Sequence, residues 1–240
     1  MNNLIYWLDL AGVTVFAFSG VIVACHSRMD PFGMFVLGAV TGIGGGTLRD
    51  LVLGVPVFWV EAPSYLWVIL ATVFLSILGF HYIHRLTRAV LPVTDAFGLA
   101  LFTVIGSHKA LVLGHAGIVA VLMGLMTGVA GGMIRDVLAH RVPMVLRQEI
   151  YATASIVGGI VYAILFISGL NNVFSIGVAL VIILSIRLTA IYWGISLPTF
   201  AWVESPTTSK KNTRANPSSS SRFKARVKMI PPELSRRRKH

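Results

Sequence analysis

Residues 42–50 read Gly-Ile-Gly-Gly-Gly-Thr-Leu-Arg-Asp, and residues 128–136 read Gly-Val-Ala-Gly-Gly-Met-Ile-Arg-Asp. The two stretches lie 86 positions apart, and the same offset aligns residues 9–50 with residues 95–136 without a gap. Twelve of these 42 aligned pairs are identical, and they fall mainly on glycine and charged residues rather than on interchangeable leucine and valine. Apolar composition alone would not align the charges, so the sequence predicts a duplicated structural unit.

The composition of the chain indicates which solvent surrounds these units. Of the 240 residues, 55% are hydrophobic and only 12% are charged, and the mean hydropathy is +0.79. A soluble domain carries about a quarter of charged residues, so much of this surface must face lipid. Seven segments approach the roughly 20 apolar residues that a spanning helix needs. They are residues 4–24, 33–53, 64–84, 94–113, 116–138, 151–169 and 173–197.

Each duplicated unit holds three spans, an odd number, so the second unit must enter the membrane from the opposite side. The predicted fold is therefore an all-α membrane protein with seven transmembrane helices, an inverted 3+3 repeat plus a seventh helix. In such proteins the solute path usually lies near the bilayer midplane, beside glycine-interrupted helices. The expected divisions are repeat 1 at 1–93, repeat 2 at 94–170, helix seven at 171–198 and a disordered, basic cytoplasmic tail at 199–240.

The distribution of basic residues predicts the orientation. Residues 1–200 hold nine Lys/Arg against seven Asp/Glu, whereas residues 201–240 hold eleven against two, so most of the net charge of +11 belongs to the tail. The basic loops lie on the same side as this tail, and Lys and Arg mark cytoplasmic loops. The loop arginines are Arg28, Arg85, Arg88, Arg141 and Arg147. We expect a multi-pass protein of the cell (inner) membrane with its N-terminus outside and its C-terminus cytoplasmic.

The tail has the composition of a disordered segment. Residues 205–240 are rich in Ser, Pro, Lys and Arg and poor in large apolar groups, so burial cannot offset the entropy of ordering them. Basic clusters beside a span are attracted to anionic headgroups, which makes membrane lipids the expected partner. Nucleic-acid binding is not expected, because no recognition fold accompanies the charge.

Both glycine motifs fall inside predicted spans, the second and the fifth. Glycine costs a helix about 1 kcal/mol relative to alanine, and a helix broken in lipid must find partners for its freed backbone groups in protein or along a water-filled cavity. We therefore expect Gly44–Gly46 and Gly131–Gly132 to kink these helices and line a cation path. Close helix packing is the alternative, and we favour it for Gly42 and Gly128, which are spaced by four from other glycines.

Ionisable residues inside a span usually face the bundle interior or a water path. Neighbouring positions on a helix point about 100° apart, so the adjacent Arg and Asp at 49–50, and those at 135–136, are not expected to neutralise each other. Asp9, near the outer end of span one, and Asp95, near the inner end of span four, are candidate partners for the arginines. We expect the motif aspartates to concentrate cations and the arginines to position helices or gate. Structural ion pairs that fix helix register are the alternative.

Two further basic residues lie within spans and have no charged counterpart in the repeat. Lys109 aligns with Val23, so the two halves are not equivalent; it is either a lipid- or voltage-sensing group or a side chain that snorkels to the outer interface. Arg187, in the last span, either snorkels or contacts an interior carboxylate. The candidate pore and gating residues are Gly44, Gly45, Gly46, Arg49, Asp50, Gly131, Gly132, Arg135, Asp136, Asp9, Asp95 and Lys109.

Catalysis and a resident metal are not expected. We find no Ser/His/Asp or Cys/His grouping that would support hydrolysis, and the histidines at predicted membrane edges lack ligand spacing. Cys25 is the only cysteine, so no intrachain disulfide can form. No enzyme activity and no cofactor are expected, apart from permeant K⁺ or Na⁺.

The duplicated glycine-rich helices that end in Arg-Asp, followed by a seventh helix, resemble the trimeric intracellular cation channels. The match is closer to the prokaryotic branch of that family, which carries a tentative glycine-transporter label. It covers residues 5–198, including Arg-Leu-Thr-Ala-Ile-Tyr-Trp at 187–193 and Pro198. The resemblance implies a homotrimer with one K⁺/Na⁺ pore inside each subunit, lined by kinked helices two and five. Animal members carry Lys-Glu-Val at the positions of residues 135–137, and that lysine contacts a phosphoinositide, so Arg135 is a candidate contact for an anionic lipid.

Two classes of function remain open. Broken helices and intramembrane carboxylates favour a passive channel for monovalent cations. An inverted repeat also suits a secondary transporter of a small solute such as glycine. A membrane scaffold without transport activity is the third, weaker alternative.

Overall fold

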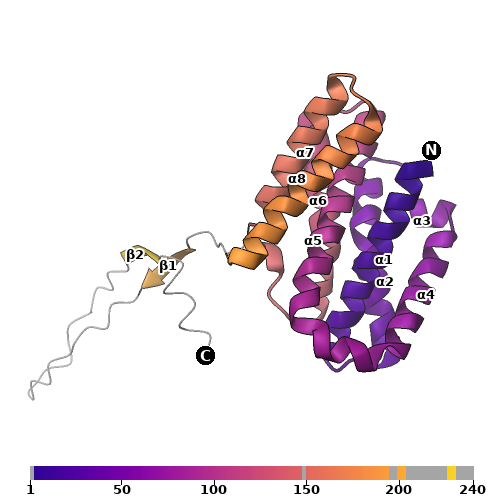
Figure 1. Cartoon of the computed structure of the whole chain (residues 1–240), viewed down its shortest axis with the longest axis vertical. Helices are drawn as coiled ribbons and strands as arrows, with labels where there is room; N and C mark the ends of the chain where they lie inside the picture. Colours follow the sequence, from indigo (N-terminus) through magenta and orange to yellow (C-terminus); the bar gives the residue numbers. More distant parts are fainter. Residues whose placement is uncertain (1–2, 148–149, 195–198, 204–225, 231–240) are drawn as a thin grey trace, which may run out of the picture. The chain divides into compact units, whose positions relative to one another are not determined.

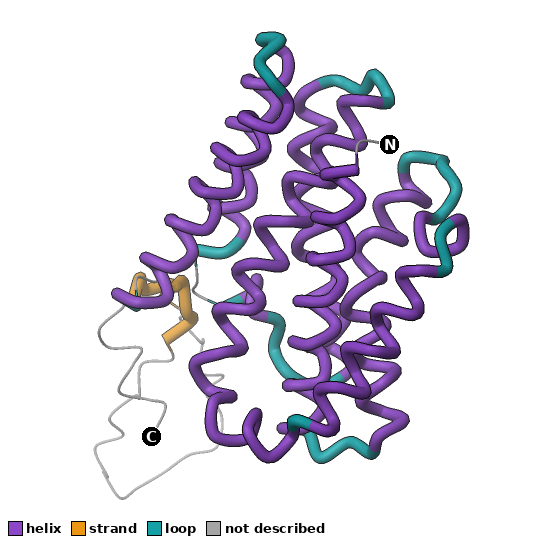
Figure 2. Tube along the Cα trace, turned by 45° about the vertical axis from the view of Figure 1, so that its right-hand side comes forward, coloured by secondary structure: helices purple, strands orange, loops and turns teal. Residues whose placement is uncertain are grey.

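The computed structural model describes residues 3–147, 150–194, 199–203 and 226–230. The chain divides into two units, Met1–Ile195 and Ser196–His240. The first unit is a helical bundle (Figure 1), and most of its loops lie at the two ends of the bundle (Figure 2).

Helices make up almost all of the described part of the first unit. They are α1 Asn3–His26, α2 Pro31–Val52, α3 Phe58–Glu61, α4 Ser64–Leu78, α5 Phe80–Val112, α6 Gly117–Leu138, the 3₁₀ helix η1 Met144–Leu146, α7 Ala152–Ile167 and α8 Asn172–Trp193. Five segments are long and apolar enough to cross a membrane: α1, α2, Val90–Val112 of α5, α6 and α8. The helices α4 and α7 are apolar but shorter, with 15 and 16 residues. The prediction of an all-helical, multi-pass membrane protein is confirmed.

Local sequence signals fix several helix ends. Asp30 precedes α2, and its carboxylate accepts a hydrogen bond from the Gly33 N–H at 2.7 Å, which satisfies one of the free donors of the first turn. Pro31 follows at the first helical position, where its missing N–H costs nothing. At its C-terminal end, α8 stops at Gly194, which adopts the left-handed conformation with φ of 59°. Glycine adopts this backbone geometry without strain.

The loop predicted between Arg85 and Pro92 is instead helical. α5 begins at Phe80 and passes through both positions, and Figure 1 shows its start crossing the end of the bundle before the helix turns to run beside α1. Pro92 lies inside this helix, where a ring clash and a missing N–H bend the backbone rather than end it. Pro92 was therefore a wrong signal for a loop.

The two duplicated halves meet through equivalent glycines of α2 and α6. A Cβ atom at Gly45 would collide with the carbonyl oxygen of Thr127, and a Cβ atom at Gly131 would lie 2.5 Å from the carbonyl oxygen of Thr41. The two glycines are 86 positions apart, and so are the two threonines. The contact between the two helices is therefore reciprocal: the glycine of each helix packs against the equivalent threonine of the other. The pairing also shows that α2 and α6 run antiparallel where they cross.

α1 and α5 make a second reciprocal contact. A Cβ atom at Gly12 would lie 3.1 Å from the Phe102 ring, and one at Gly98 would collide with the Phe16 ring. The two phenylalanine rings meet edge to face with centroids 5.2 Å apart, a favoured aromatic geometry. Each glycine thus makes room for the phenylalanine of the other half.

The backbone of the glycine-rich helices is not broken at the glycines, and a kink there stays a prediction. α2 and α6 are each continuous α-helices through their glycines. Instead, the missing side chains allow close packing, because a Cβ atom at Gly42 would lie 3.1 Å from the Val13 carbonyl oxygen and one at Gly46 would lie 2.5 Å from the Phe58 ring. The packing role that we favoured for Gly42 is confirmed, and the same role extends to the cluster Gly44–Gly46.

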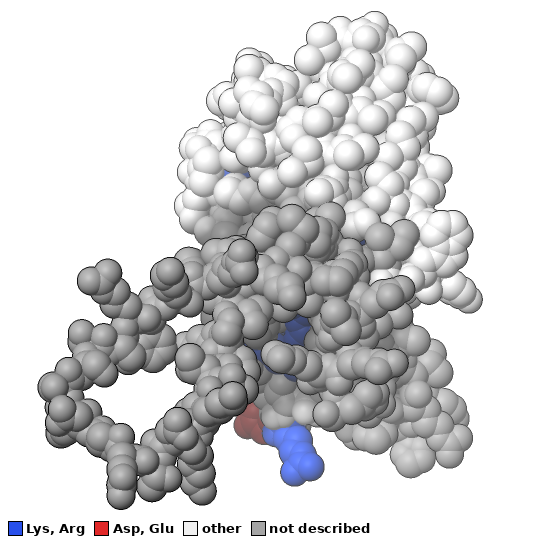
Figure 3. Space-filling model, turned by 90° about the vertical axis from the view of Figure 1, so that its left-hand side faces the viewer, with Lys and Arg blue, Asp and Glu red and all other residues white. Residues whose placement is uncertain are grey.

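The outer surface of the bundle suits a lipid environment. Large apolar side chains are exposed on several helices, among them Trp67, Leu75, Ile164 and Val181. Figure 3 shows the side of the first unit on which α7 and α8 lie, and the described surface there is almost free of charged atoms. A soluble protein would not leave so much contiguous apolar surface uncovered.

The second unit contains a short two-stranded sheet. β1 Thr199–Val203 pairs antiparallel with β2 Arg226–Ile230, and Thr199 lies opposite Ile230. These ten residues therefore differ from the predicted disorder of residues 199–240, and the run of Thr, Phe, Trp and Val in β1 has the composition of a strand. The other residues of the tail lie outside the described part of the chain, and disorder there stays a prediction.

Candidate functional site

Charged side chains gather in two buried clusters, one at the C-terminal end of α2 and one at that of α6. The Asp50 cluster consists of Asp9, Arg49, Asp50, Phe58, Tyr65 and Lys109. The Asp136 cluster consists of Ser19, Asp95, Arg135, Asp136, Met144, Tyr151 and Arg187. Because α2 and α6 cross antiparallel, these ends point in opposite directions along the bundle.

The Asp50 carboxylate is hydrogen-bonded on both oxygens. Its Oδ1 accepts from Arg49 Nε at 2.7 Å and from Lys109 Nζ at 2.8 Å, and its Oδ2 accepts from the backbone N–H of Phe58 at 3.0 Å. The Arg49 guanidinium also lies 5.5 Å from the centroid of the Phe58 ring, within cation–π range. Asp50 therefore ties the end of α2 to α5 and to the first residue of α3.

Asp9 completes this cluster from α1. Its Oδ2 accepts a hydrogen bond from the Tyr65 hydroxyl at 3.0 Å, while Asp9 itself is only 6% exposed. Within the described part of the chain, Asp9 Oδ1 and Arg49 Nη1 are buried and have no hydrogen-bond partner. A buried carboxylate oxygen without a partner is costly, so this oxygen is the place in the cluster where water or a cation would be best received.

The Asp136 cluster repeats this arrangement. Asp136 Oδ1 accepts from Arg135 Nε at 2.9 Å, and Oδ2 accepts from the backbone N–H of Met144 at 3.1 Å. Arg135 Nη1 donates to Asp95 Oδ1 at 3.0 Å and to Ser19 Oγ at 2.9 Å. Among the residues described, Asp95 Oδ2 is buried without a hydrogen-bond partner, as Asp9 Oδ1 is in the other cluster.

Two of the contributing pairs were missed by sequence reasoning, although the repeat contains them. Phe58 and Met144 lie 86 positions apart, as do Tyr65 and Tyr151. Each member of the first pair gives its N–H to a motif aspartate. In the second pair, Tyr65 donates to Asp9, and Tyr151 lies beside Asp95, since a Cβ atom at Gly132 would be 3.2 Å from Asp95 Oδ1 and 3.4 Å from the Tyr151 hydroxyl. Extending the alignment beyond residue 50 would have found all four.

The expectation about adjacent charges was wrong. Arg49 and Asp50 do form an ion pair, and so do Arg135 and Asp136. The Cα–Cβ bonds diverge as expected, but the long arginine side chain returns its Nε to the neighbouring carboxylate. The expected partner Asp95 is confirmed for Arg135. Asp9, by contrast, is bonded to Tyr65 rather than forming an ion pair with Arg49 within the described residues.

Lys109 and Arg187 both join the clusters. Lys109 lies on α5 and is bonded to Asp50, with 31% of its side chain exposed, so it is not simply directed to the interface as a snorkelling side chain would be. Arg187 on α8 is fully buried; its Nη1 donates to the Ile150 carbonyl oxygen at 3.1 Å, and its guanidinium lies 4.5 Å from the centroid of the Tyr151 ring. Snorkelling of Arg187 is therefore excluded.

The fold and these clusters define the protein as a multi-pass α-helical membrane protein whose ionisable groups are buried at two places in the bundle. The sequence model of the family described as "Glycine transporter" matches residues 6–81 and 92–166. The inner membrane protein YadS of Escherichia coli is 51% identical over 202 residues, which cover 82% of this chain and 97% of that protein.

Solved structures of cation channels have the same fold. The trimeric intracellular cation (TRIC) channel orthologue from Rhodobacter sphaeroides is 37% identical, covers 81% of this chain with all of its own, and superposes with a TM-score of 0.75. A prokaryotic TRIC channel crystallised in 0.5 M KCl is 29% identical, covers 82% of this chain with its entire length, and gives a TM-score of 0.76. The chain belongs to the trimeric intracellular cation channel family, in its prokaryotic branch.

Proposed function

We propose that the protein is a channel for monovalent cations, K⁺ and Na⁺, with a conduction path inside each subunit between α2 and α6. The observation that carries the proposal is the similarity over about four-fifths of the chain to solved TRIC cation channels. The charged cluster at the end of each of these two helices supports this course of the path.

The finer architecture belongs to the same proposal. α4 and α7 would join the five longer segments as spans, giving seven transmembrane helices. The reciprocal contacts of Gly45 with Thr127 and of Gly131 with Thr41 support an inverted 3+3 repeat whose two-fold axis passes through the crossing of α2 and α6. The relatives' description as trimeric channels supports a homotrimer in the inner membrane, with the N-terminus outside.

The contacts suggest a division of roles among the candidate residues. The glycines of α2 and α6 set how closely the helices approach along the path. Asp50 and Asp136 are occupied by ion pairs and backbone donors, so they anchor the helix ends. The carboxylates that offer a buried oxygen to a permeating cation are Asp9 and Asp95. The Coulomb attraction between a cation and a carboxylate in contact is on the order of 1–4 kcal/mol at effective dielectric constants of 80 to 20.

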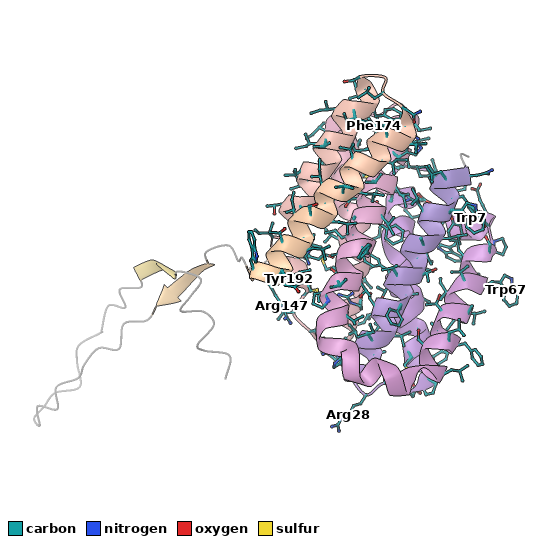
Figure 4. All side chains as sticks on the ribbon, in the orientation of Figure 1. Trp7, Arg28, Trp67, Arg147, Phe174 and Tyr192 are labelled. Carbon is teal, nitrogen blue, oxygen red and sulfur yellow. The ribbon has the colours of Figure 1, made fainter. Side chains whose placement is uncertain are left out.

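Anionic lipids are the proposed partners, but the proposed point of contact is no longer Arg135. Arg135 is fully buried and donates to three side chains, so a headgroup could reach it only if the Asp136 cluster opened. Arg28 and Arg147 are exposed and lie toward the end of the bundle away from the N-terminus (Figure 4). These arginines, together with the basic tail, are better placed to meet the headgroups of an anionic leaflet.

Purified protein in planar bilayers under a KCl gradient tests the function. We expect unitary current steps that reverse toward the K⁺ equilibrium potential. The family description as a glycine transporter makes a secondary transporter the second candidate. Absence of current, together with saturable glycine uptake into liposomes that depends on an ion gradient, would replace the channel with that transporter.

A further inference from the structure

The duplicated residues alone leave each cluster with an unbalanced charge. The repeat supplies one arginine and two aspartates to each: Asp9, Arg49 and Asp50 in one, and Asp95, Arg135 and Asp136 in the other. With all groups ionised, each set carries a charge of −1. Since an uncompensated charge is costly inside a membrane bundle, each cluster needs one further cation from outside the duplicated pattern.

Lys109 supplies that cation to the Asp50 cluster. Its Nζ lies 2.8 Å from Asp50 Oδ1, and it lies outside the duplicated pattern, because its counterpart in the first half is the uncharged Val23. Val23 is fully buried among apolar residues and brings no charge to the other half. The Asp136 cluster must therefore be balanced in another way.

Arg187 is the buried cation beside the Asp136 cluster. It comes from α8, which lies outside the duplicated units, and its guanidinium stacks on the ring of Tyr151 at 4.5 Å. Tyr151 in turn lies beside Asp95, because Asp95 Oδ1 and the Tyr151 hydroxyl would both lie within 3.4 Å of a Cβ atom at Gly132. The hydrogen bond from Arg187 Nη1 to the Ile150 carbonyl fixes the guanidinium next to the residue that precedes Tyr151.

We propose that Arg187 is the counter-charge of the Asp136 cluster, filling there the role that Lys109 fills in the Asp50 cluster, and that α8 thereby sets the charge at one end of the conduction path. The second part rests on the proposed channel function. Arg187 acts through Tyr151 and Asp95 and is a positioning residue rather than a contact for the permeant ion.

The two counter-charges differ in their freedom to move. The side chain of Lys109 is 31% exposed, and its flexible ammonium group is held by an ion pair with Asp50, so it can leave Asp50 for solvent. Arg187 is 0% exposed and is held by a ring and a carbonyl oxygen, so it can leave only with α8. The charge of the Asp50 cluster can therefore change through one side chain, whereas that of the Asp136 cluster changes only with a movement of a whole helix.

A thermal-stability cycle on the purified, full-length oligomer tests the charge balance. Arg187→Met should lower the melting temperature, since the cluster would carry −1. Adding Asp95→Asn should restore part of the loss, because the cluster is neutral again. Adding Asp9→Asn, in the other cluster, should restore nothing, and Arg187→Lys should lose less than Arg187→Met. The double variant Arg187→Met with Asp95→Asn is compared with the double variant Arg187→Met with Asp9→Asn. Equal melting temperatures for these two proteins would overturn the proposal and reduce Arg187 to a packing role.

Bilayer recordings test the effect on the path, with Gly177→Ala on the same helix as the control, because nothing lies within 4 Å of a Cβ atom there. Arg187→Met should shift the reversal potential in a KCl gradient further toward the K⁺ equilibrium potential, whereas the control should not. If the wild type conducts and Arg187→Met reverses at the wild-type potential, this inference fails while the channel function stands. A silent wild type would instead refute the channel function, and the stability cycle would still decide the charge balance.

Discussion

At the scale of single residues, Asp50 and Asp136 act as anchors. Each accepts from the neighbouring arginine on one oxygen and from a backbone N–H eight residues later on the other. The second bond holds the first residue of the short helix that follows, α3 or η1. Hydrogen bonds to a charged acceptor are stronger than neutral ones, so these carboxylates fix the turn after each glycine-rich helix.

Asp136→Asn should therefore be strongly destabilising. Removing one member of a buried ion pair typically costs about 3–5 kcal/mol, because Arg135 would keep a charge with fewer partners. Asp30→Asn is the matched control, since Asp30 is exposed and caps α2, and asparagine is as good a cap as aspartate. The measurement is the thermal stability of the oligomer in detergent. Equal effects of the two substitutions would mean that Asp136 is not an anchor.

Tyr65→Phe tests the partner of Asp9. The Tyr65 hydroxyl donates a hydrogen bond to Asp9 Oδ2, and leaving a buried charged acceptor unsatisfied costs about 1–3 kcal/mol. Tyr6→Phe provides the comparison, because the Tyr6 hydroxyl donates at 2.8 Å to the neutral Ser64 Oγ, a bond worth about 1 kcal/mol. A larger fall in melting temperature for Tyr65→Phe is expected. The opposite order would show that Asp9 is satisfied by other means.

How far such contacts can be predicted depends on what the repeat encodes. The pairing of Arg135 with Asp95 was accessible because duplicated, intramembrane charges of opposite sign have few alternatives. The bond from Lys109 to Asp50 was not accessible, since no counterpart of Lys109 exists in the first half and a four-carbon side chain can reach several groups. Tyr65 and Tyr151 were missed because they carry no charge. A buried carboxylate also needs neutral hydrogen-bond donors, and a tyrosine hydroxyl is one of them.

At the scale of elements, the crossing of α2 and α6 is decided by glycine at two positions. The carbonyl oxygens of Thr127 and Thr41 occupy the space that side chains at Gly45 and Gly131 would need. Each threonine hydroxyl is turned back to a carbonyl oxygen of its own helix at 2.5 Å. The helices can approach this closely only because glycine has no Cβ, as in other small-residue crossings of membrane helices.

Gly45→Ala and Gly131→Ala should each push these helices apart. Forcing a methyl group into a packed contact costs about 1–3 kcal/mol, and the equivalence of the two positions predicts similar losses. Gly177→Ala on α8 is the control, since nothing lies within 4 Å of a Cβ atom there; it should be neutral or stabilising by up to about 1 kcal/mol. The melting temperature and the unitary conductance are the measurements. A Gly45→Ala protein as stable as Gly177→Ala would refute the close crossing.

The elements were predictable where length and hydropathy agree. The predicted segments 4–24 and 116–138 match α1 and α6 within about two residues, which is the usual uncertainty of a helix end. The start of α5 was not predictable, because a proline and basic residues inside a helix resemble a loop when only the sequence is read. The continuity of α2 through Gly44–Gly46 was also missed. Helix propensity describes an isolated helix and does not include the close packing against a neighbouring helix that glycine allows.

At the scale of the whole membrane unit, exposed arginines mark one end of the bundle. Arg28 and Arg147 lie toward the end away from the N-terminus, whereas aromatic residues occur toward both ends, with Trp7 and Phe174 near the start of the chain and Tyr192 at the level of Arg147 (Figure 4). Aromatic side chains favour both membrane interfaces, but arginine accumulates on the cytoplasmic side only. The bundle thus carries an asymmetry that its internal duplication would not produce.

This asymmetry predicts the orientation, with the N-terminus outside and the C-terminus in the cytoplasm. Arg28, Arg141 and Arg147 lie in loops that the sequence predicts to face the same side as the basic tail, and each near-membrane basic residue on the negative leaflet is worth about 1 kcal/mol. A reporter that is active only in the cytoplasm should therefore be active when fused after residue 194 and inactive when fused before α1. Replacing Arg28, Arg141 and Arg147 by glutamine should weaken this preference and give a mixed population. A C-terminal reporter active only outside the cytoplasm would reverse the assignment, and would place the Asp50 cluster, with its releasable Lys109, at the cytoplasmic end of the path.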